Sequence, residues 1–449
     1  MDHVIRQARS FSIDRRRAVQ LSAASTGIAA FSYRAAAAQA DATSGASPVA
    51  DGDVPVSGEA VPELADFDAL MVEAMPKWNL PGGQLAIAHE GRLVYNRGFG
   101  YASVEDNEAV APEMTFRIAS TTKPVTAVAI LKLIDAGELT LDTPVFPLLA
   151  LEPPPDAPRD PRLDTITVEQ LLVHSGGWNS AANNNDPQHL PWPVMASHLL
   201  EAENPAEAET IIRYVLSKPL EFDPGTLSAY SNFGFNVLGR VIEHLSGQDY
   251  EQFVLEEVLT PAGATSMAIG GTTLAERIDG EVRYYSPPDL PPAPSVYPGE
   301  GFVPAGYGSY YMQSLDAHGG WIAAAADLLR FTLAVDGARG EALLSPESVT
   351  ALETTQRPPS AAAGAGNVEG GFGLGWNSAP VDGGYEWSHA GALEGSNCSW
   401  VVRKPGGTAL ALVFNSLPTD FGAFFGETFP AMLELLAGTT EWPETDLFG

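Results

Sequence analysis

A serine and a lysine stand three residues apart at the start of an apolar run. Residues 120–123 read Ser-Thr-Thr-Lys, followed by Pro124 and an almost wholly apolar stretch that ends at Ile134. Because Pro is tolerated in the first helical turn, we expect Ser120 at or just before a helix start, with Lys123 on the same face. A serine hydroxyl needs a nearby base, and a lysine in a poorly hydrated site can lose its proton readily. The pair is therefore a candidate nucleophile and base, although the polar N-terminus of an ordinary core helix has the same appearance.

A tyrosine with an asparagine two places further on forms the second pattern, Tyr230-Ser231-Asn232. A phenol near a cationic lysine can give up and take back a proton, which suits general acid–base catalysis. The amide of Asn232 can both donate to and accept from a substrate amide or ester. The structural alternative is a buried tyrosine followed by a helix-capping asparagine.

A histidine and a glycine form the third pattern, His389-Ala390-Gly391, on a strand predicted to start near Tyr385. A donor or cation at His389 could hold a substrate carboxylate or support the tyrosine, and Gly391 would let substrate approach the strand backbone closely. Position and context favour this motif over the others of the same shape. Those others begin at His89, His174, His318 and Lys404.

These three motifs, in this order, resemble the serine β-lactamase and penicillin-binding-protein superfamily, and most of all its class C β-lactamase-like branch. Further stretches extend the resemblance over roughly residues 66–438. They are Phe-Arg-Ile-Ala at 116–119, Leu-Leu-Val-His-Ser-Gly-Gly at 171–177, Pro-Gly-Thr at 224–226 and Gly-Phe-Gly-Leu-Gly-Trp at 371–376.

The resemblance implies that Ser120 is the acylated nucleophile of a serine hydrolase. It implies that Lys123 and Tyr230 share proton transfer, with either one as the principal base. The oxyanion hole would consist of the backbone N–H groups of Ser120 and Ala392, and one such donor is worth roughly 3 kcal/mol. No metal or cofactor is implied, and the sequence has neither a His-Glu-x-x-His motif nor a Gly-x-Ser-x-Gly elbow.

The resemblance also implies the groups that bind substrate. Asn232 would orient the substrate, and His389 takes the place of the lysine common at the third motif, with Gly391 beside it. This histidine is compatible with esterases, D-alanyl peptidases and D-aminopeptidases, and it lowers the expectation of efficient β-lactam hydrolysis. Esters are therefore the leading substrate class, with small amides, β-lactams and peptidoglycan peptides as alternatives. A binding module that kept the fold but lost turnover is the alternative of another class.

Strands at both ends of the chain and helices in its middle position these motifs. We therefore expect an α/β (α+β) fold, with an antiparallel sheet built from both chain ends and flanked by helices, and a mostly helical inserted subdomain at about 135–310. The hairpin strands are expected at 85–88 and 93–97, around the turn His89-Glu90-Gly91. Further strands are predicted at 386–403 and 409–415, around a turn at 404–407, and helices at 62–75, 321–335 and 424–436.

Composition excludes several functions. The chain has 449 residues, with 24 basic and 56 acidic side chains and a net charge of −32. Such a surface repels phosphates, which argues against nucleic acid as a partner. Cys398 is the only cysteine, so an intrachain disulfide and a multi-cysteine zinc site are impossible.

The first 40 residues resemble a cleavable export signal. Three arginines at 15–17 precede a mildly apolar stretch that reaches Phe31, and small residues follow at 36–40. This pattern is typical of a twin-arginine signal, and Arg34 interrupts the run too early for a membrane anchor. We therefore expect a periplasmic or secreted protein without a membrane span in its mature chain. Its domain is expected at 62–440, after a disordered linker at 41–61 and before a tail at 441–449.

Some residues leave two interpretations open or favour the plainer one. His174 is interpreted as structural, and the segment 183–186 as solvated loop. The aromatic residues of the loop 287–311 could line a cleft or pack the loop itself. These are Tyr297, Phe302, Tyr307, Tyr310 and Tyr311.

Overall fold

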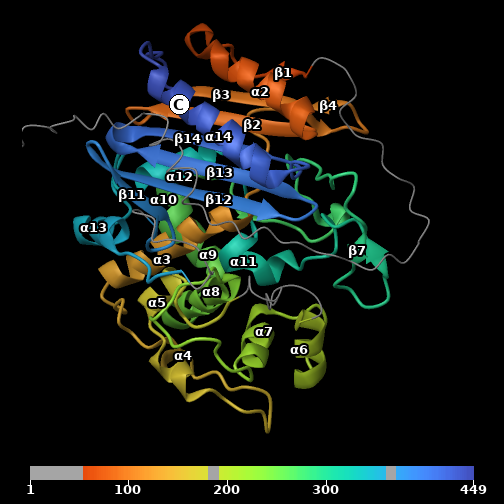
Figure 1. Ribbon diagram of the computed structural model, residues 1–449, viewed down its shortest axis with the longest axis vertical. Coiled ribbons are helices and arrows are strands. Elements are labelled where there is room, and N and C mark those ends of the chain that lie inside the picture. Colours follow the sequence, from red (N-terminus) through yellow and green to blue (C-terminus); the bar gives the residue numbers. More distant parts are fainter. Residues whose placement is uncertain (1–53, 180–191, 361–370) are drawn as a thin grey trace, which may run out of the picture.

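The main sheet takes its strands from both ends of the chain. In the computed structural model, which describes residues 54–179, 192–360 and 371–449, its order is β1-β3-β2-β14-β13-β12-β11-β10, with β4 paired to β3. The N-terminal strand β2 lies beside the C-terminal strand β14, and Ala86 is opposite Ala411 (Figure 1). All of these pairings are antiparallel. The predicted fold class is confirmed.

A tight turn joins β2 and β3, as the sequence predicts. Glu90 and Gly91 in this turn have φ of 51° and 75°, and two positive φ angles match the right-handed twist of a hairpin. The strands are β1 (Val56–Ser57), β2 (Gly82–His89), β3 (Arg92–Ser103), β4 (Glu108–Ala109), β10 (Gly371–Phe372), β11 (Asn377–Val381), β12 (Gly384–Leu393), β13 (Asn397–Lys404) and β14 (Thr408–Phe414).

The single strand predicted over 386–403 is wrong, because the chain reverses in its middle. β12 ends at Leu393 and β13 begins at Asn397. Gly395 in the turn has φ of 70°, and the N–H of Ser396 donates to the carbonyl oxygen of Leu393 at 3.0 Å. A glycine tolerates this left-handed conformation, so a tight turn can form at Gly395. The strand-forming residues on both sides of it make the segment resemble one continuous strand. β14 and the turn at 404–407 lie where they are predicted.

The helix predicted over 321–335 begins too early. Trp321–Ala323 form strand β9, between β5 (Phe116–Arg117) and β6 (Ala268–Ile269) in a small three-stranded sheet. Helix α12 then covers Ala325–Ala334. A short apolar run fits either period, and here two neighbouring strands supply backbone partners.

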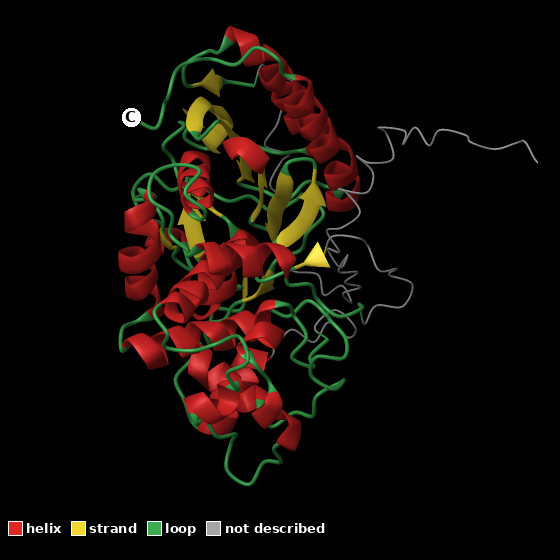
Figure 2. Cartoon of the chain, turned by 90° about the vertical axis from the view of Figure 1, so that its left-hand side faces the viewer, coloured by secondary structure: helices red, strands yellow, loops and turns green. Residues whose placement is uncertain are grey.

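Two hydrophobic cores cover the two faces of the main sheet. On one face, α2 (Ala65–Trp78) and α14 (Phe421–Gly438) pack against alternate residues such as Leu410 and Leu412 of β14. On the other face, α12 packs against Ala409, Ala411 and Val413. The alternation follows from the two-residue period of a strand. Figure 2 shows the strands between these helical layers. The helices predicted at 62–75 and 424–436 correspond to α2, preceded by a 3₁₀ turn at 62–64, and to α14.

A mostly helical region lies below the sheet in Figure 1. At its centre, α3 (Thr122–Asp135) is buried over most of its length, so every face of it is apolar or paired. The helices around it are α4 (Val145–Leu149), α5 (Val168–Leu172), α6 (Trp192–Leu200), α7 (Ala208–Val215), α8 (Asn232–Ser246), α9 (Tyr250–Val254), α10 (Thr260–Ala262) and α11 (Asp316–Gly319), with α13 (Pro346–Thr354) beside β11.

Both ends of the described chain lie against the sheet. Val56–Ser57 form β1 inside the segment predicted as linker, because their backbone pairs with β3. In the predicted tail, Trp442 stacks on His89 and the N–H of Leu447 donates to the carbonyl oxygen of Leu93. The predicted signal at 1–40, the linker up to residue 53 and the predicted loop at 183–186 lie outside the described residues.

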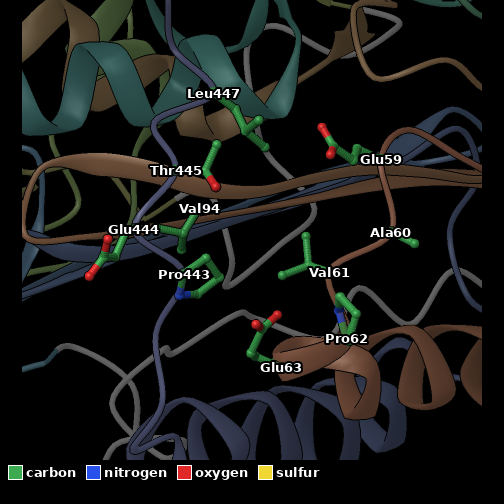
Figure 3. A pocket seen from close by; sticks show the side chains of 10 residues that line it. All are labelled: Glu59, Ala60, Val61, Pro62, Glu63, Val94, Pro443, Glu444, Thr445 and Leu447. Atoms are coloured by element: carbon green, nitrogen blue, oxygen red, sulfur yellow. The ribbon is translucent and has the colours of Figure 1, made fainter.

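A hollow of about 250 Å³ lies between the two terminal segments (Figure 3). Residues 59–63, 443–445 and 447 line it together with Val94, and three of these residues are glutamates. None of the residues of the three sequence motifs lines this hollow. Within the described ranges, we find no helix with the length and apolarity needed to cross a membrane.

Candidate active site

Ser120 lies in a short 3₁₀ turn, η2 (Ala119–Thr121), that leads directly into α3. Ala119 has φ of 45°, a left-handed conformation that is uncommon for a residue with a side chain. Such strain is held by surrounding contacts: the Ser399 hydroxyl of β13 donates to the carbonyl oxygen of Ile118 at 2.6 Å. The turn therefore presents Ser120 at the junction of the sheet and the helical region.

Lys123 and Tyr230 both reach the hydroxyl of Ser120. The Lys123 Nζ donates to Ser120 Oγ at 3.1 Å, and the Tyr230 hydroxyl contacts the same Oγ at 2.7 Å. The Lys123 side chain is buried completely, and its Nζ lies 4.8 Å from the centre of the Tyr230 ring. Residues 110 positions apart in the chain thus meet at one oxygen atom.

Two further acceptors hold the Lys123 ammonium. Its Nζ donates to Asn232 Oδ1 at 2.7 Å and to the main-chain oxygen of His318 at 2.9 Å. With Ser120 these make three acceptors, which matches the three N–H bonds of an ammonium group. The Tyr230 hydroxyl lies within hydrogen-bond distance of the same Ser120 Oγ, so it is placed to exchange a proton with Ser120.

Asn232 is the first residue of α8, and its side chain turns inward to Lys123. The capping role that the sequence allows for Asn232 belongs to Ser231, whose hydroxyl accepts from the N–H of Gly234 at 3.2 Å. The asparagine is therefore available to the site, and the capping alternative is wrong.

Gly391 on β12 lies directly against the turn that carries Ser120. A Cβ atom on Gly391 would stand 2.2 Å from the carbonyl oxygen of Ile118 and 3.0 Å from the backbone nitrogen of Ser120. The glycine is thus required by the packing of two backbone segments, a constraint separate from the substrate approach that its motif predicts. Ala392 follows it, paired with Cys398 of β13. The strand brings the two residues of the predicted oxyanion hole to one junction.

His389 is buried and neutral. Burial, followed by the positive charge of Lys123, lowers the pKa of His389 to about 3. Its Nδ1–H donates to the carbonyl oxygen of Ala390 at 2.8 Å, and the Phe372 ring packs edge-on at 5.4 Å between ring centres. The sequence allows a cation at the third motif, but this histidine does not supply one near neutral pH.

The competing motifs of the same shape lie elsewhere, except for two. His89 stacks on Trp442, and Lys404 pairs with Glu386. The main-chain oxygen of His318 accepts from Lys123, and the residue type at 318 could not have predicted this contact. His174, interpreted from sequence as structural, packs against the Tyr230 ring at 4.6 Å between centres. In the sequence, the segment that carries His174 precedes the Tyr230 motif, and this order is the signal that could have indicated the contact.

The aromatic loop residues divide between packing and the site. Tyr307 packs beside Tyr284 and under the guanidinium of Arg117. Tyr311 donates to Glu207 at 3.0 Å, and Phe302 is 66% exposed. Tyr310 packs on a small cluster that includes Ala119, the residue before Ser120.

The fold is that of the β-lactamase and penicillin-binding-protein superfamily, as the sequence motifs predict. Residues 67–429 match the family described as Beta-lactamase, and the chain belongs to this family.

Relatives and structures are consistent with this membership. Esterase EstB of Burkholderia gladioli is 29% identical over 381 residues, covering 78% of this chain and 90% of EstB. Protein flp of Staphylococcus aureus (strain COL) is 26% identical over 213 residues, and the match spans only 40% of that protein. The structure of the D-amino acid amidase from Ochrobactrum anthropi SV3 is similar over 84% of this chain and 99% of that chain, with a TM-score of 0.63 and 20% identity. At this identity the likeness concerns the fold alone.

Proposed function

We propose that the protein is a serine hydrolase that cleaves carboxylic esters through an acyl-enzyme on Ser120. The observation that carries the proposal is the double contact at Ser120 Oγ, from Tyr230 at 2.7 Å and from Lys123 at 3.1 Å. A nucleophile within hydrogen-bond reach of its base, with the base oriented by a third group, is the arrangement that activates a serine.

The reaction proceeds in two halves. In the first, Ser120 Oγ passes its proton to the Tyr230–Lys123 pair and attacks the ester carbonyl. The oxyanion rests on the N–H groups of Ser120 and Ala392, and Asn232 orients the substrate. The leaving alcohol takes the proton back as its C–O bond breaks, and the acyl group stays on Ser120. In the second half, a water molecule gives a proton to the Tyr230–Lys123 pair and attacks the acyl carbonyl. The bond to Ser120 Oγ then breaks, Oγ takes the proton back, and the carboxylic acid is released.

The neutral third motif favours esters over substrates that need a carboxylate anchor. A β-lactam or a D-alanyl peptide presents a carboxylate, and the buried, uncharged His389 gives it no ion pair near neutral pH. The esterase name of EstB, with 29% identity over most of both chains, supports the same ranking. β-Lactams and D-alanyl peptides are therefore secondary substrates of this proposal, and small amides, to which the carboxylate argument does not apply, are the other alternative.

We also propose that the protein is exported, on the sequence pattern of residues 1–40. The mature enzyme would then meet small-molecule substrates in the periplasm or outside the cell.

A substrate panel on the purified mature chain tests the proposed activity. It contains short-chain nitrophenyl esters, a chromogenic cephalosporin and D-alanyl peptides, with Ser120→Ala as the matched control. We expect ester turnover to exceed the other two, and a fluorophosphonate probe to add its mass to Ser120. Turnover that survives Ser120→Ala would overturn the proposal. Absence of both labelling and turnover would support the binding module, and cephalosporin cleavage above ester cleavage would reverse the substrate ranking.

A further inference from the structure

We propose that His174 is the positioning residue that holds the Tyr230 phenol on Ser120. This inference rests on the proposed function, because it concerns the proton transfer at that site. His174 bonds to the residues on both sides of Tyr230: its Nδ1 accepts from the N–H of Ser231 at 3.1 Å, and its carbonyl oxygen accepts from the N–H of Ala229 at 2.9 Å. One residue thus fixes the backbone before and after the tyrosine.

The imidazole of His174 also supports the phenol ring directly. Ring centres lie 4.6 Å apart for His174 and Tyr230, 4.5 Å for His174 and Phe372, and 5.2 Å for His174 and Phe235. His174 is only 3% exposed. Packed on several sides, the ring has little freedom, and neither has the tyrosine that rests on it.

These contacts require a neutral imidazole. Because Nδ1 accepts a hydrogen bond, the proton of the neutral ring is on Nε2. Burial lowers the pKa of His174 well below its ordinary value, and the charges of Lys123 and Arg357 act in the same direction. Protonation at Nδ1 would remove the acceptor for Ser231 and repel Lys123. His174 therefore holds Tyr230 as a neutral imidazole, which is the form that its burial favours. We call this set of contacts the clamp.

The backbone of His174 is part of the device. It has φ of 58°, and it follows the end of α5, where its N–H donates to the carbonyl oxygen of Leu171. Asparagine tolerates this left-handed conformation better than other residues with a side chain. Its amide oxygen can also stand close to the position of Nδ1, which makes His174→Asn a conservative variant that keeps the acceptor.

Three substitutions separate the clamp from simple packing. His174→Asn keeps an acceptor and the backbone conformation, His174→Leu removes the acceptor, and His174→Gly removes the ring without backbone strain. Leu163→Ala, a buried change elsewhere in the helical region, serves as a control for lost stability alone. Thermal melts identify variants that fail to fold.

We expect His174→Leu and His174→Gly to lower kcat for a nitrophenyl ester about 10- to 100-fold, because displacement of a catalytic group by about 1 Å costs this much. KM should change less than about threefold, and the acidic limb of the kcat profile should move to higher pH as Tyr230 leaves the charge of Lys123. His174→Asn should restore most of kcat and the native profile, and Leu163→Ala should keep that profile.

Two kinetic outcomes overturn the inference: a native kcat and pH profile in folded His174→Gly, or His174→Asn as impaired as His174→Leu. A crystal structure of His174→Leu gives a readout that needs no substrate. We expect its Tyr230 hydroxyl to lie beyond hydrogen-bond distance of Ser120 Oγ. An unmoved phenol in His174→Leu would overturn the clamp. If the phenol moves but the parent protein shows no ester turnover, only the proposed function is overturned.

Discussion

Gly391 and Ile118 are in contact so close that no side chain fits between them. A Cβ on Gly391 would lie 2.2 Å from the carbonyl oxygen of Ile118 and 2.5 Å from the Ser399 hydroxyl that holds this oxygen. We expect Gly391→Ala to push β12 away from the turn of Ser120, to destabilise the fold by about 1–3 kcal/mol and to lower kcat about 100-fold. Urea unfolding and ester kinetics measure both effects.

Gly426 on α14 provides the matched control for this substitution, since an added Cβ there meets no atom within 4 Å. Gly426→Ala should leave kcat unchanged and stabilise the helix by up to about 1 kcal/mol. Equal kinetics for the two variants would contradict the tight fit assigned to Gly391.

Tyr230→Phe should abolish most turnover while it leaves the fold intact. The substitution removes only the hydroxyl that contacts Ser120 Oγ at 2.7 Å. General acid–base catalysis is worth about 100- to 10,000-fold, so kcat should fall by an amount in this range. Circular dichroism should be that of the parent protein. A loss smaller than about tenfold would assign the base role to Lys123 alone.

Lys123→Met should cost both activity and stability. It leaves Asn232 Oδ1 and the His318 carbonyl oxygen without the donor they share. Buried acceptors that lose a partner cost about 1–3 kcal/mol, and turnover should be lost with the charge. Denaturant midpoints compare this variant with Tyr230→Phe. Full stability in Lys123→Met would show that these contacts contribute nothing to the fold.

The buried His389 makes the protein sensitive to acid. Its pKa is about 3 in the folded state and about 6.5 when exposed, so between these values the unfolded chain binds more protons than the folded chain. The free energy of unfolding therefore falls as pH decreases through this window, by up to about 1.4 kcal/mol per pH unit from this group. The contribution of His389 to this dependence is halved at about pH 6.5 and vanishes above about pH 7.5.

His389→Gln removes this contribution, while the buried His174 still adds a dependence of the same sign. Urea unfolding at pH 6.5 and pH 5.0 should show a loss smaller by about 1.6 kcal/mol in the variant than in the parent. An identical loss in both proteins would mean that His389 is protonated in the folded state.

The proposed export signal predicts a processed N-terminus. In a bacterial host, the mature chain should begin near residue 41 and lie outside the cytoplasm. Arg16→Lys with Arg17→Lys should retain the precursor inside if the route requires adjacent arginines. Cell fractionation and N-terminal sequencing detect both species, and an unprocessed, cytoplasmic parent protein would remove this proposal.

Much of the architecture and the central residues could be predicted from local patterns. Residue types alone determine three features: the two-residue period of the end strands, the apolar character of α3 and the three motifs. These features can therefore be recognised in the sequence. The break between β12 and β13 was missed because one turn, at 394–396, interrupts a run of strand-forming residues. β9 was missed because its partners β5 and β6 are far away in the chain.

Two parts of the site depend on geometry that residue types do not reveal. The His318 contact with Lys123 uses a main-chain oxygen, which every residue possesses. The role of His174 depends on its backbone angle and on the distance to Tyr230, neither of which follows from a motif. Likewise, Ser231 and Asn232 are both good capping residues, and only the fold decides which one caps α8.

The pairing of β2 with β14 joins residues more than 300 positions apart, such as Ala86 and Ala411. A ribosome must therefore release nearly the whole polypeptide before Gly391 can dock on the turn of Ser120. Contacts of such long sequence separation form slowly, because the entropy of closing a long loop opposes them. In a nascent or C-terminally truncated chain, the turn of Ser120 would thus lack the strands that pack against it. The serine would become reactive only once synthesis is complete.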